Sequence, residues 1–152
     1  MINRIFFISF ISILIVYGCK KDTCFCGYLK IEYGTSFGEC MGYCKRDISI
    51  APDKIVFTKS GWADSVITRH CDQDLSGDDF KALTGKIDLR DFKDLDEVIG
   101  CPDCADGGAE WIRIVTPDLD KKVTFEYGNE PDKVKPFIRI LRDYLISFEN
   151  CG

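Results

Sequence analysis

The chain has 152 residues, of which 45% are hydrophobic and 30% are charged, and its formal net charge is −5 at pH 7. This acidity argues against a protein that binds nucleic acid or anionic lipid through a broad basic surface. Nine cysteines would be unusual in a reducing compartment without metal, whereas disulfides persist outside the cytoplasm.

The first 18 residues have the features of an export signal. Arg4 and the amino terminus are positively charged, and an apolar run from 5 to 17 follows, interrupted only by Ser9 and Ser12. A membrane-spanning helix needs about 20 apolar residues, whereas a signal-peptide core is shorter. We therefore expect residues 1–18 to be a cleaved signal peptide, in preference to a buried core helix.

The cleavage region, Val16-Tyr17-Gly18-Cys19, resembles a lipobox, at which a bacterial lipoprotein is lipidated on cysteine and cut just before it. Tyr17 departs from the pattern, so simple secretion after cleavage behind Gly18 is the alternative. The next residues, Lys20-Lys21-Asp22, resemble the short charged tract that follows the lipidated cysteine in many lipoproteins of the Bacteroidota. Two or more acyl chains on Cys19 would anchor the protein stably in a membrane of the cell envelope.

Eight cysteines remain when Cys19 is set aside, and an even number suits a complete set of disulfides. Eight cysteines allow 105 connectivities, so the sequence leaves the pairing open. The expected disulfide cysteines are Cys24, Cys26, Cys40, Cys44, Cys71, Cys101, Cys104 and Cys151.

Residues 19–27 are expected to form a tether, and residues 28–152 a single domain. Alternating apolar residues predict a strand over 28–33, with Leu29, Ile31 and Tyr33 inward, and a loop over 34–45 follows. Two short strands over 47–50 and 54–58 flank the turn at 51–53, and a further strand is expected over 65–71. The inward candidates of the two short strands are Ile48, Ile50, Ile55 and Phe57.

The helical period appears after this point. Ser76 is a good N-cap for a short helix that Gly85 closes, and a second helix is expected over 91–99. After a loop over 101–109, strands are expected over 111–116 and 123–127, the latter with Val123, Phe125 and Tyr127 inward. The last element is a helix with an apolar stripe of Val134, Phe137, Ile138, Leu141, Leu145 and Phe148.

This order of strands, helices, a hairpin and a helix predicts an α+β fold. We expect a mostly antiparallel sheet with helices packed on one face, stabilised by disulfides. Any function would then lie on the other face or at a loop end.

The segment Gly38-Glu39-Cys40-Met41-Gly42-Tyr43, between two expected strands, resembles a motif of a domain-of-unknown-function family of Bacteroidota lipoproteins. The resemblance covers residues 29–148 and implies the same succession of a strand pair, a helix pair, a hairpin and a final helix. The chain departs from the family by Asp53-Lys54 in place of Asp-Gly and by the extra Cys44. The resemblance implies no activity, and no site residue follows from it.

Cys101-Pro102-Asp103-Cys104 is the sharpest chemical candidate, because a C-x-x-C pair can exchange disulfides when a helix N-terminus stabilises its thiolate. Here the pair follows a helix and leads into a loop, which favours a structural disulfide. The short cysteine pairs and His70-Cys71 could also bind zinc, although oxidation would compete with the metal outside the cytoplasm.

Other patterns are weaker. Residues 34–38 match G-x-S-x-G, but a nucleophile elbow needs a helix after the turn. The acidic residues at 72–79 and 103–110 lack the spacing of an EF-hand, and Trp62 and Trp111 suit packing better than a sugar-binding platform. We therefore expect no catalytic residue, no metal and no cofactor, and no nucleic-acid partner.

The sequence favours a non-enzymatic, membrane-anchored envelope lipoprotein that binds a protein or ligand. An envelope thiol–disulfide oxidoreductase that uses Cys101 and Cys104 is the alternative, and a purely structural envelope component is the third hypothesis.

Overall fold

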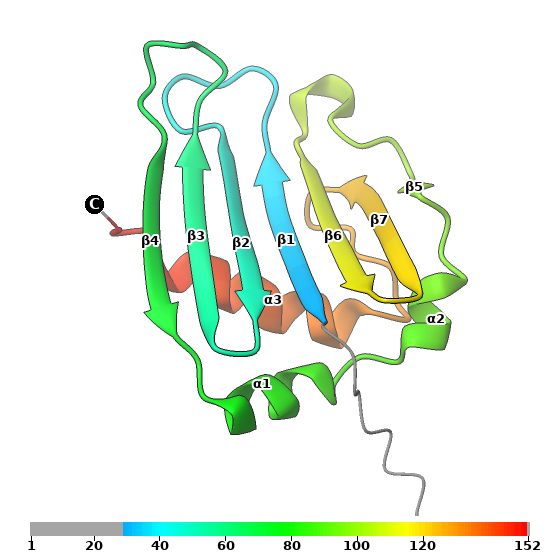
Figure 1. Cartoon of the computed structure of the whole chain (residues 1–152). Helices are drawn as coiled ribbons and strands as arrows, with labels where there is room; N and C mark the ends of the chain where they lie inside the picture. Colours follow the sequence, from blue (N-terminus) through cyan, green and yellow to red (C-terminus); the bar gives the residue numbers. More distant parts are fainter. Residues whose placement is uncertain (1–28, 152) are drawn as a thin grey trace, which may run out of the picture.

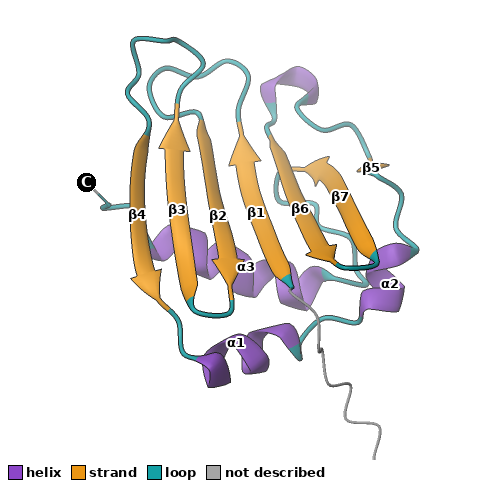
Figure 2. Ribbon diagram, viewed as in Figure 1, coloured by secondary structure: helices purple, strands orange, loops and turns teal. Residues whose placement is uncertain are grey.

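The computed structural model describes residues 29–151, which form one seven-stranded sheet and three α-helices (Figures 1 and 2). The strand order is β4-β3-β2-β1-β6-β7-β5, and all neighbours are antiparallel except the parallel pair β5 and β7. The strands are β1 Lys30–Ser36, β2 Lys45–Ala51, β3 Lys54–Ser60, β4 Arg69–Asp74, β5 Val98–Ile99, β6 Ala109–Thr116 and β7 Leu119–Glu126. The helices are α1 Gly77–Thr84, α2 Leu89–Lys93 and α3 Lys135–Ser147, with a short 3-10 turn at Cys104–Asp106.

The core lies between the sheet and α3. Strand side chains alternate between two faces, so Ile31, Tyr33 and their cross-strand neighbours point the same way. Ile31 is paired with Ile50 and Ile114, and Tyr33 with Ile48 and Ile112. The apolar stripe of α3 covers this face along β1 and β2 (Figure 2). All six predicted stripe residues, Val134, Phe137, Ile138, Leu141, Leu145 and Phe148, are buried.

The prediction of a mostly antiparallel sheet combined with helices is confirmed. Of the seven inward residues predicted for 28–33, 47–50 and 54–58, six have no exposed surface and Leu29 is 3% exposed. Ser76 caps α1 as predicted, since its hydroxyl oxygen accepts a hydrogen bond from the Asp79 amide. The first strand is longer than predicted and ends at Ser36, so the loop is 37–44. In the hairpin, β7 begins at Leu119, before the predicted start.

Three other predictions are wrong. The strand expected over 65–71 begins only at Arg69, and Ile67 is 68% exposed in the preceding loop. No residue of this edge strand is fully buried, so its sequence shows no alternating apolar pattern that would mark it. The second helix ends at Lys93 rather than at residue 99.

Residues 98–99 instead form β5 beside β7, where the Thr124 amide donates to the Glu97 carbonyl oxygen at 2.8 Å. This non-local pairing overrides the helical spacing of the sequence. The third wrong prediction is the inward orientation of Tyr127. This residue follows β7 and is 47% exposed.

The two ends of the sheet differ in character. The end at which β1 begins carries the short hairpin turns, whereas the loops 37–44, 61–68 and 100–108 lie together at the other end (Figure 1). We call these three loops the loop end. The chain enters the sheet at Lys30, and β1 separates this point from the loop end by seven residues, about 20 Å. Within residues 29–151, no helix has the length and apolar character to cross a membrane.

Candidate functional site

A buried ionic cluster lies beneath the loop end, between the sheet and α3. Glu110 of β6 is fully buried on the α3 side, where its carboxylate accepts the Tyr33 hydroxyl at 2.6 Å. Arg142 of α3 donates to both carboxylate oxygens at 2.9 and 2.8 Å. This bidentate geometry is the strongest form of an arginine–carboxylate pair.

Glu130 extends the cluster. It accepts Arg142 Nη2 at 3.0 Å and Arg139 Nε at 3.3 Å. Burial opposes the charge of Glu130, but hydrogen bonds from its own backbone and from Arg142 prevail and lower the pKa of its carboxyl. Burial and the neighbouring Glu110 raise the pKa of Tyr33, so its hydroxyl remains a donor. The cluster therefore holds α3 in a fixed position on the sheet.

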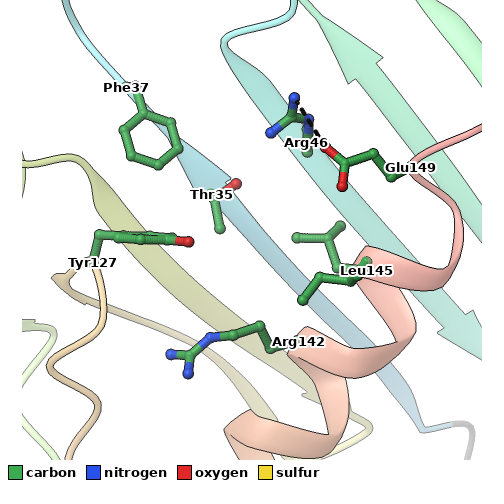
Figure 3. A pocket seen from close by; sticks show the side chains of 8 residues that line it. Thr35, Phe37, Arg46, Tyr127, Arg142, Leu145 and Glu149 are labelled. Atoms are coloured by element: carbon green, nitrogen blue, oxygen red, sulfur yellow. Dashed lines mark ion pairs between the residues drawn. The ribbon is translucent and has the colours of Figure 1, made fainter.

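A pocket of about 270 Å³ opens beside this cluster (Figure 3). Thr35, Arg46, Arg142 and Glu149 supply its polar groups, while Phe37, Tyr127, Leu145 and Ile146 are apolar or aromatic. The rings of Phe37 and Tyr127 meet edge to face, with centroids 5.0 Å apart. The pocket thus combines an aromatic corner with two guanidinium groups.

The loop end carries exposed apolar side chains on a braced framework. Met41 is 99% exposed, Ile67 68% and Trp62 52%. The indole N–H of Trp62 donates to the Phe37 carbonyl oxygen at 2.7 Å, and the ammonium of Lys45 lies 3.6 Å from the ring centroid. Trp62 is therefore held in place although it is exposed, and it joins the loop 61–68 to the loop 37–44.

Disulfides brace two of these loops. Cys40–Cys44 closes the loop 37–44 and Cys101–Cys104 closes part of the loop 100–108, with Cα separations of 5.6 and 5.5 Å. The Gly38 amide donates to the Asp103 carboxylate at 3.2 Å, which links the two loops. The third bridge, Cys71–Cys151, ties the end of the chain to the edge strand β4. Cys19, Cys24 and Cys26 lie outside the described residues.

The C-x-x-C pair does not have the surroundings of a reactive thiol. Both cysteines are exposed, and Cys104 opens only a three-residue 3-10 turn rather than a long helix. Carboxylates lie close to the pair, since Glu126 accepts the Cys101 amide at 2.7 Å and Asp103 and Asp106 lie in the same loop. Carboxylates at this position disfavour a thiolate electrostatically.

The other sequence candidates are dispersed. His70 hydrogen-bonds Thr58 Oγ1 at 3.1 Å. Thr35 and Ser36 of the G-x-S-x-G pattern lie in β1, and a loop to the strand β2 follows them, so the pattern does not form a nucleophile elbow. Among the side chains of residues 29–151, no three of His, Cys, Asp or Glu gather in a way that could hold a metal ion. Trp111 lies in β6 with its ring over Gly34 of β1, whereas Trp62 lies in the loop 61–68.

Arg46, Arg142 and Glu149 of the pocket were not predicted from the sequence. A signal for Arg46 was present, because it shares its strand face with the predicted inward residues Ile48 and Ile50. Arg142 lies next to Leu141 of the helical stripe. A charged residue on a predicted core face indicates either a buried ion pair or a site. Arg142 forms an ion pair with the buried Glu110, and both Arg46 and Arg142 line the pocket.

No family model matches the chain, and no curated protein matches it either.

Proposed function

We propose that the protein is a lipid-anchored lipoprotein of the cell envelope whose loop end binds a partner, and that it is not an enzyme. The observation that carries this proposal is the set of exposed apolar side chains at the loop end, opposite the point where the chain enters the sheet. Met41 lies on the disulfide-closed loop 37–44, and Trp62 and Ile67 lie on the loop 61–68, which the Trp62 indole joins to the first loop by a hydrogen bond. Rigid, exposed aromatic and methionine side chains are enriched in protein interfaces.

The position of the loop end suits an anchored protein. An anchor on Cys19 would reach the domain through Lys30, so the loop end would point away from the membrane by about the length of the sheet. Helices packed on one face of the sheet, as the sequence predicts, would leave the loop end free for contact. Loops on a rigid scaffold are the usual place for binding residues.

The anchor is tested by mass spectrometry of the protein purified from its native envelope under non-reducing conditions, with thiol alkylation. The proposal predicts acyl chains on Cys19 and no residues before it. An unmodified chain that begins at Cys19 would show that the protein is secreted without lipid.

The binding surface is tested by photo-crosslinking in the native envelope. A photoreactive residue at position 41 is expected to give a discrete crosslinked product, whereas one at Asp53, in the exposed turn at the opposite end, gives none. The test is specific if Ile67→Asp removes the product at position 41. Equal crosslinking at both positions would contradict a binding role for the loop end.

The oxidoreductase alternative makes a separate prediction, motivated by the exposure of both Cys101 and Cys104. A thiol–disulfide enzyme would catalyse the reduction of insulin, and Cys101→Ser would abolish that activity. We expect no catalysis by the purified protein, and the variant is expected to behave as the parent does.

A further inference from the structure

We propose that the pocket beside Arg46 binds a carboxylate attached to an apolar or aromatic group. The carboxylate belongs either to a small free acid or to the C-terminal residue of a polypeptide. The inference rests on the binding role proposed above and names the chemistry that the site recognises. It depends on three features of the pocket, namely an available guanidinium, a rigid second arginine and an aromatic corner.

The guanidinium of Arg46 is available. Within residues 29–151, its one ion pair is with Glu149, at 3.6 Å between Nη2 and Oε1, and no side-chain hydrogen bond forms. A charge-assisted hydrogen bond to a carboxylate is about 2.7–2.9 Å long. Both partners are on the surface, with side chains 39% and 59% exposed, so the pair is held weakly. An incoming carboxylate can therefore displace Glu149 and occupy the guanidinium in a bidentate manner.

Arg142 forms a second, rigid wall of the same pocket. Its Nε and Nη2 are fixed by Glu110 and Glu130, whereas Nη1 makes no hydrogen bond with any residue from 29 to 151. Arg46 and Arg142 line the pocket from β2 and α3, with Leu145 between them (Figure 3). Because Glu110 and Glu130 neutralise Arg142, Arg46 is the guanidinium that binds the anion, and Arg142 serves as the rigid wall beside it.

The remaining walls select what the carboxylate is attached to. Phe37 and Tyr127 form an aromatic corner, and Leu145 of α3 continues the apolar surface (Figure 3). Ile146 of the same helix also lines the pocket. A volume of about 270 Å³ lies just below the range of about 300–1,000 Å³ typical of small-molecule sites. The pocket therefore suits one amino-acid residue or a small aromatic acid, and not a long chain or a dinucleotide.

The test is isothermal titration calorimetry of the purified full chain with N-acetyl-L-phenylalanine and with its uncharged amide. We expect the acid to bind at least tenfold more tightly than the amide. Arg46→Gln is expected to weaken binding of the acid at least tenfold and to remove the preference for acid over amide. Lys54→Gln is the control, because it removes a comparably exposed cation at the start of β3, next to the hairpin turn, and should change nothing.

Glu149→Gln provides a test in the opposite direction. It removes the carboxylate that competes for Arg46, so the acid should bind several-fold more tightly. General damage to the fold would weaken binding in both variants. Thermal melting is expected to be unchanged in both, because an exposed ion pair contributes less than about 1 kcal/mol.

The carboxylate comes either from a small free acid or from a polypeptide C-terminus. Two peptides that end in phenylalanine, one with a free carboxylate and one amidated, distinguish these sources. If the free-acid peptide binds at least tenfold more tightly than N-acetyl-L-phenylalanine, the site recognises a polypeptide C-terminus; equal affinity assigns it to free acids. The inference is overturned if acid and amide bind equally, if the acid does not bind at millimolar concentration, or if Arg46→Gln has no effect. These results leave the crosslinking test at position 41 unaffected, so the two proposals fail separately.

Discussion

Glu110 illustrates how one buried charge can organise a site. Its carboxylate is fully buried, but it is matched by Arg142 and by the Tyr33 hydroxyl, so no charge is left without a partner. A buried ion pair contributes little net stability compared with an apolar pair, yet the loss of one partner is costly. The role of Glu110 is therefore to fix the position of Arg142 at the pocket wall.

Glu110→Ala should lower the free energy of unfolding by about 3–5 kcal/mol, because it removes the bidentate partner of the half-buried Arg142 and leaves the buried Tyr33 hydroxyl without its acceptor. The matched control is Glu149→Ala, which removes a carboxylate from an exposed pair and should cost less than about 1 kcal/mol. Urea denaturation at neutral pH measures both. Equal effects of the two substitutions would show that the cluster does not hold α3 on the sheet.

Asp47 is a carboxylate whose removal is predicted to stabilise the protein, by an amount that depends on pH. Burial and the nearby carboxylate of Glu32 raise the pKa of Asp47 above its ordinary value. The folded protein then holds this proton more tightly than the unfolded chain, so stability falls as pH rises through the ordinary and then the raised pKa.

Asp47→Asn should therefore be more stable than the parent at neutral pH, and the difference should shrink as pH falls toward about 3. Thermal melting across this range measures it. A variant less stable than the parent at neutral pH would contradict the assigned direction.

At the scale of elements, α3 is the main partner of the sheet. Its buried residues recur at helical spacing and meet the inward side chains of β1 and β2. Leu141→Ala should cost about 2–5 kcal/mol, because it opens a cavity in this interface. Ile146→Ala on the same helix is the control, since Ile146 is 58% exposed and its truncation should cost less than about 1 kcal/mol.

The sequence predicted those elements whose apolar residues follow a clear period. Ile31, Ile48, Ile55 and the stripe of α3 are examples, because the period reflects burial directly. It misplaced β4, which was expected over 65–71, and it did not predict β5. The first is an edge strand without a buried face, and the second depends on pairing with β7, which lies more than twenty residues further along the chain.

The same reasoning explains why the candidate site was only partly predictable. The loop 37–44 and the Cys101–Cys104 pair could be singled out from their residue types. The pocket could not, because Arg46, Tyr127 and Glu149 are far apart in the sequence and only the register of the sheet and the docking of α3 bring them together.

At the scale of the whole molecule, we expect the disulfide Cys71–Cys151 to contribute more to the free energy of unfolding than either of the other two described disulfides. It closes a loop with a sequence separation of 80, whereas Cys40–Cys44 spans 4. Loop-closure entropy then gives about 4–5 kcal/mol for the long loop and about 2 kcal/mol for the short one. The double variant Cys71→Ser/Cys151→Ser should therefore unfold at clearly lower urea than Cys40→Ser/Cys44→Ser, and the reverse order would contradict this account.

The arrangement of the molecule separates the contacts that stabilise the fold from the surface proposed to bind a partner. The core, the ionic cluster and Cys71–Cys151 hold α3 and the sheet together, while the loop end and the adjoining pocket present Met41, Trp62 and Arg46 to the surroundings. An anchored binding module requires such a division, because its binding surface must keep its shape at a distance from the membrane.

The most direct test of this account is hydroxyl-radical footprinting of the protein in its native envelope and after purification. Each residue is compared with itself in the two states. The account predicts that Met41, Trp62 and Ile67 are protected in the envelope, whereas Val98, which is 62% exposed at the far edge of the sheet, is labelled equally in both. Equal labelling of the loop end in the two states would contradict a partner at this surface.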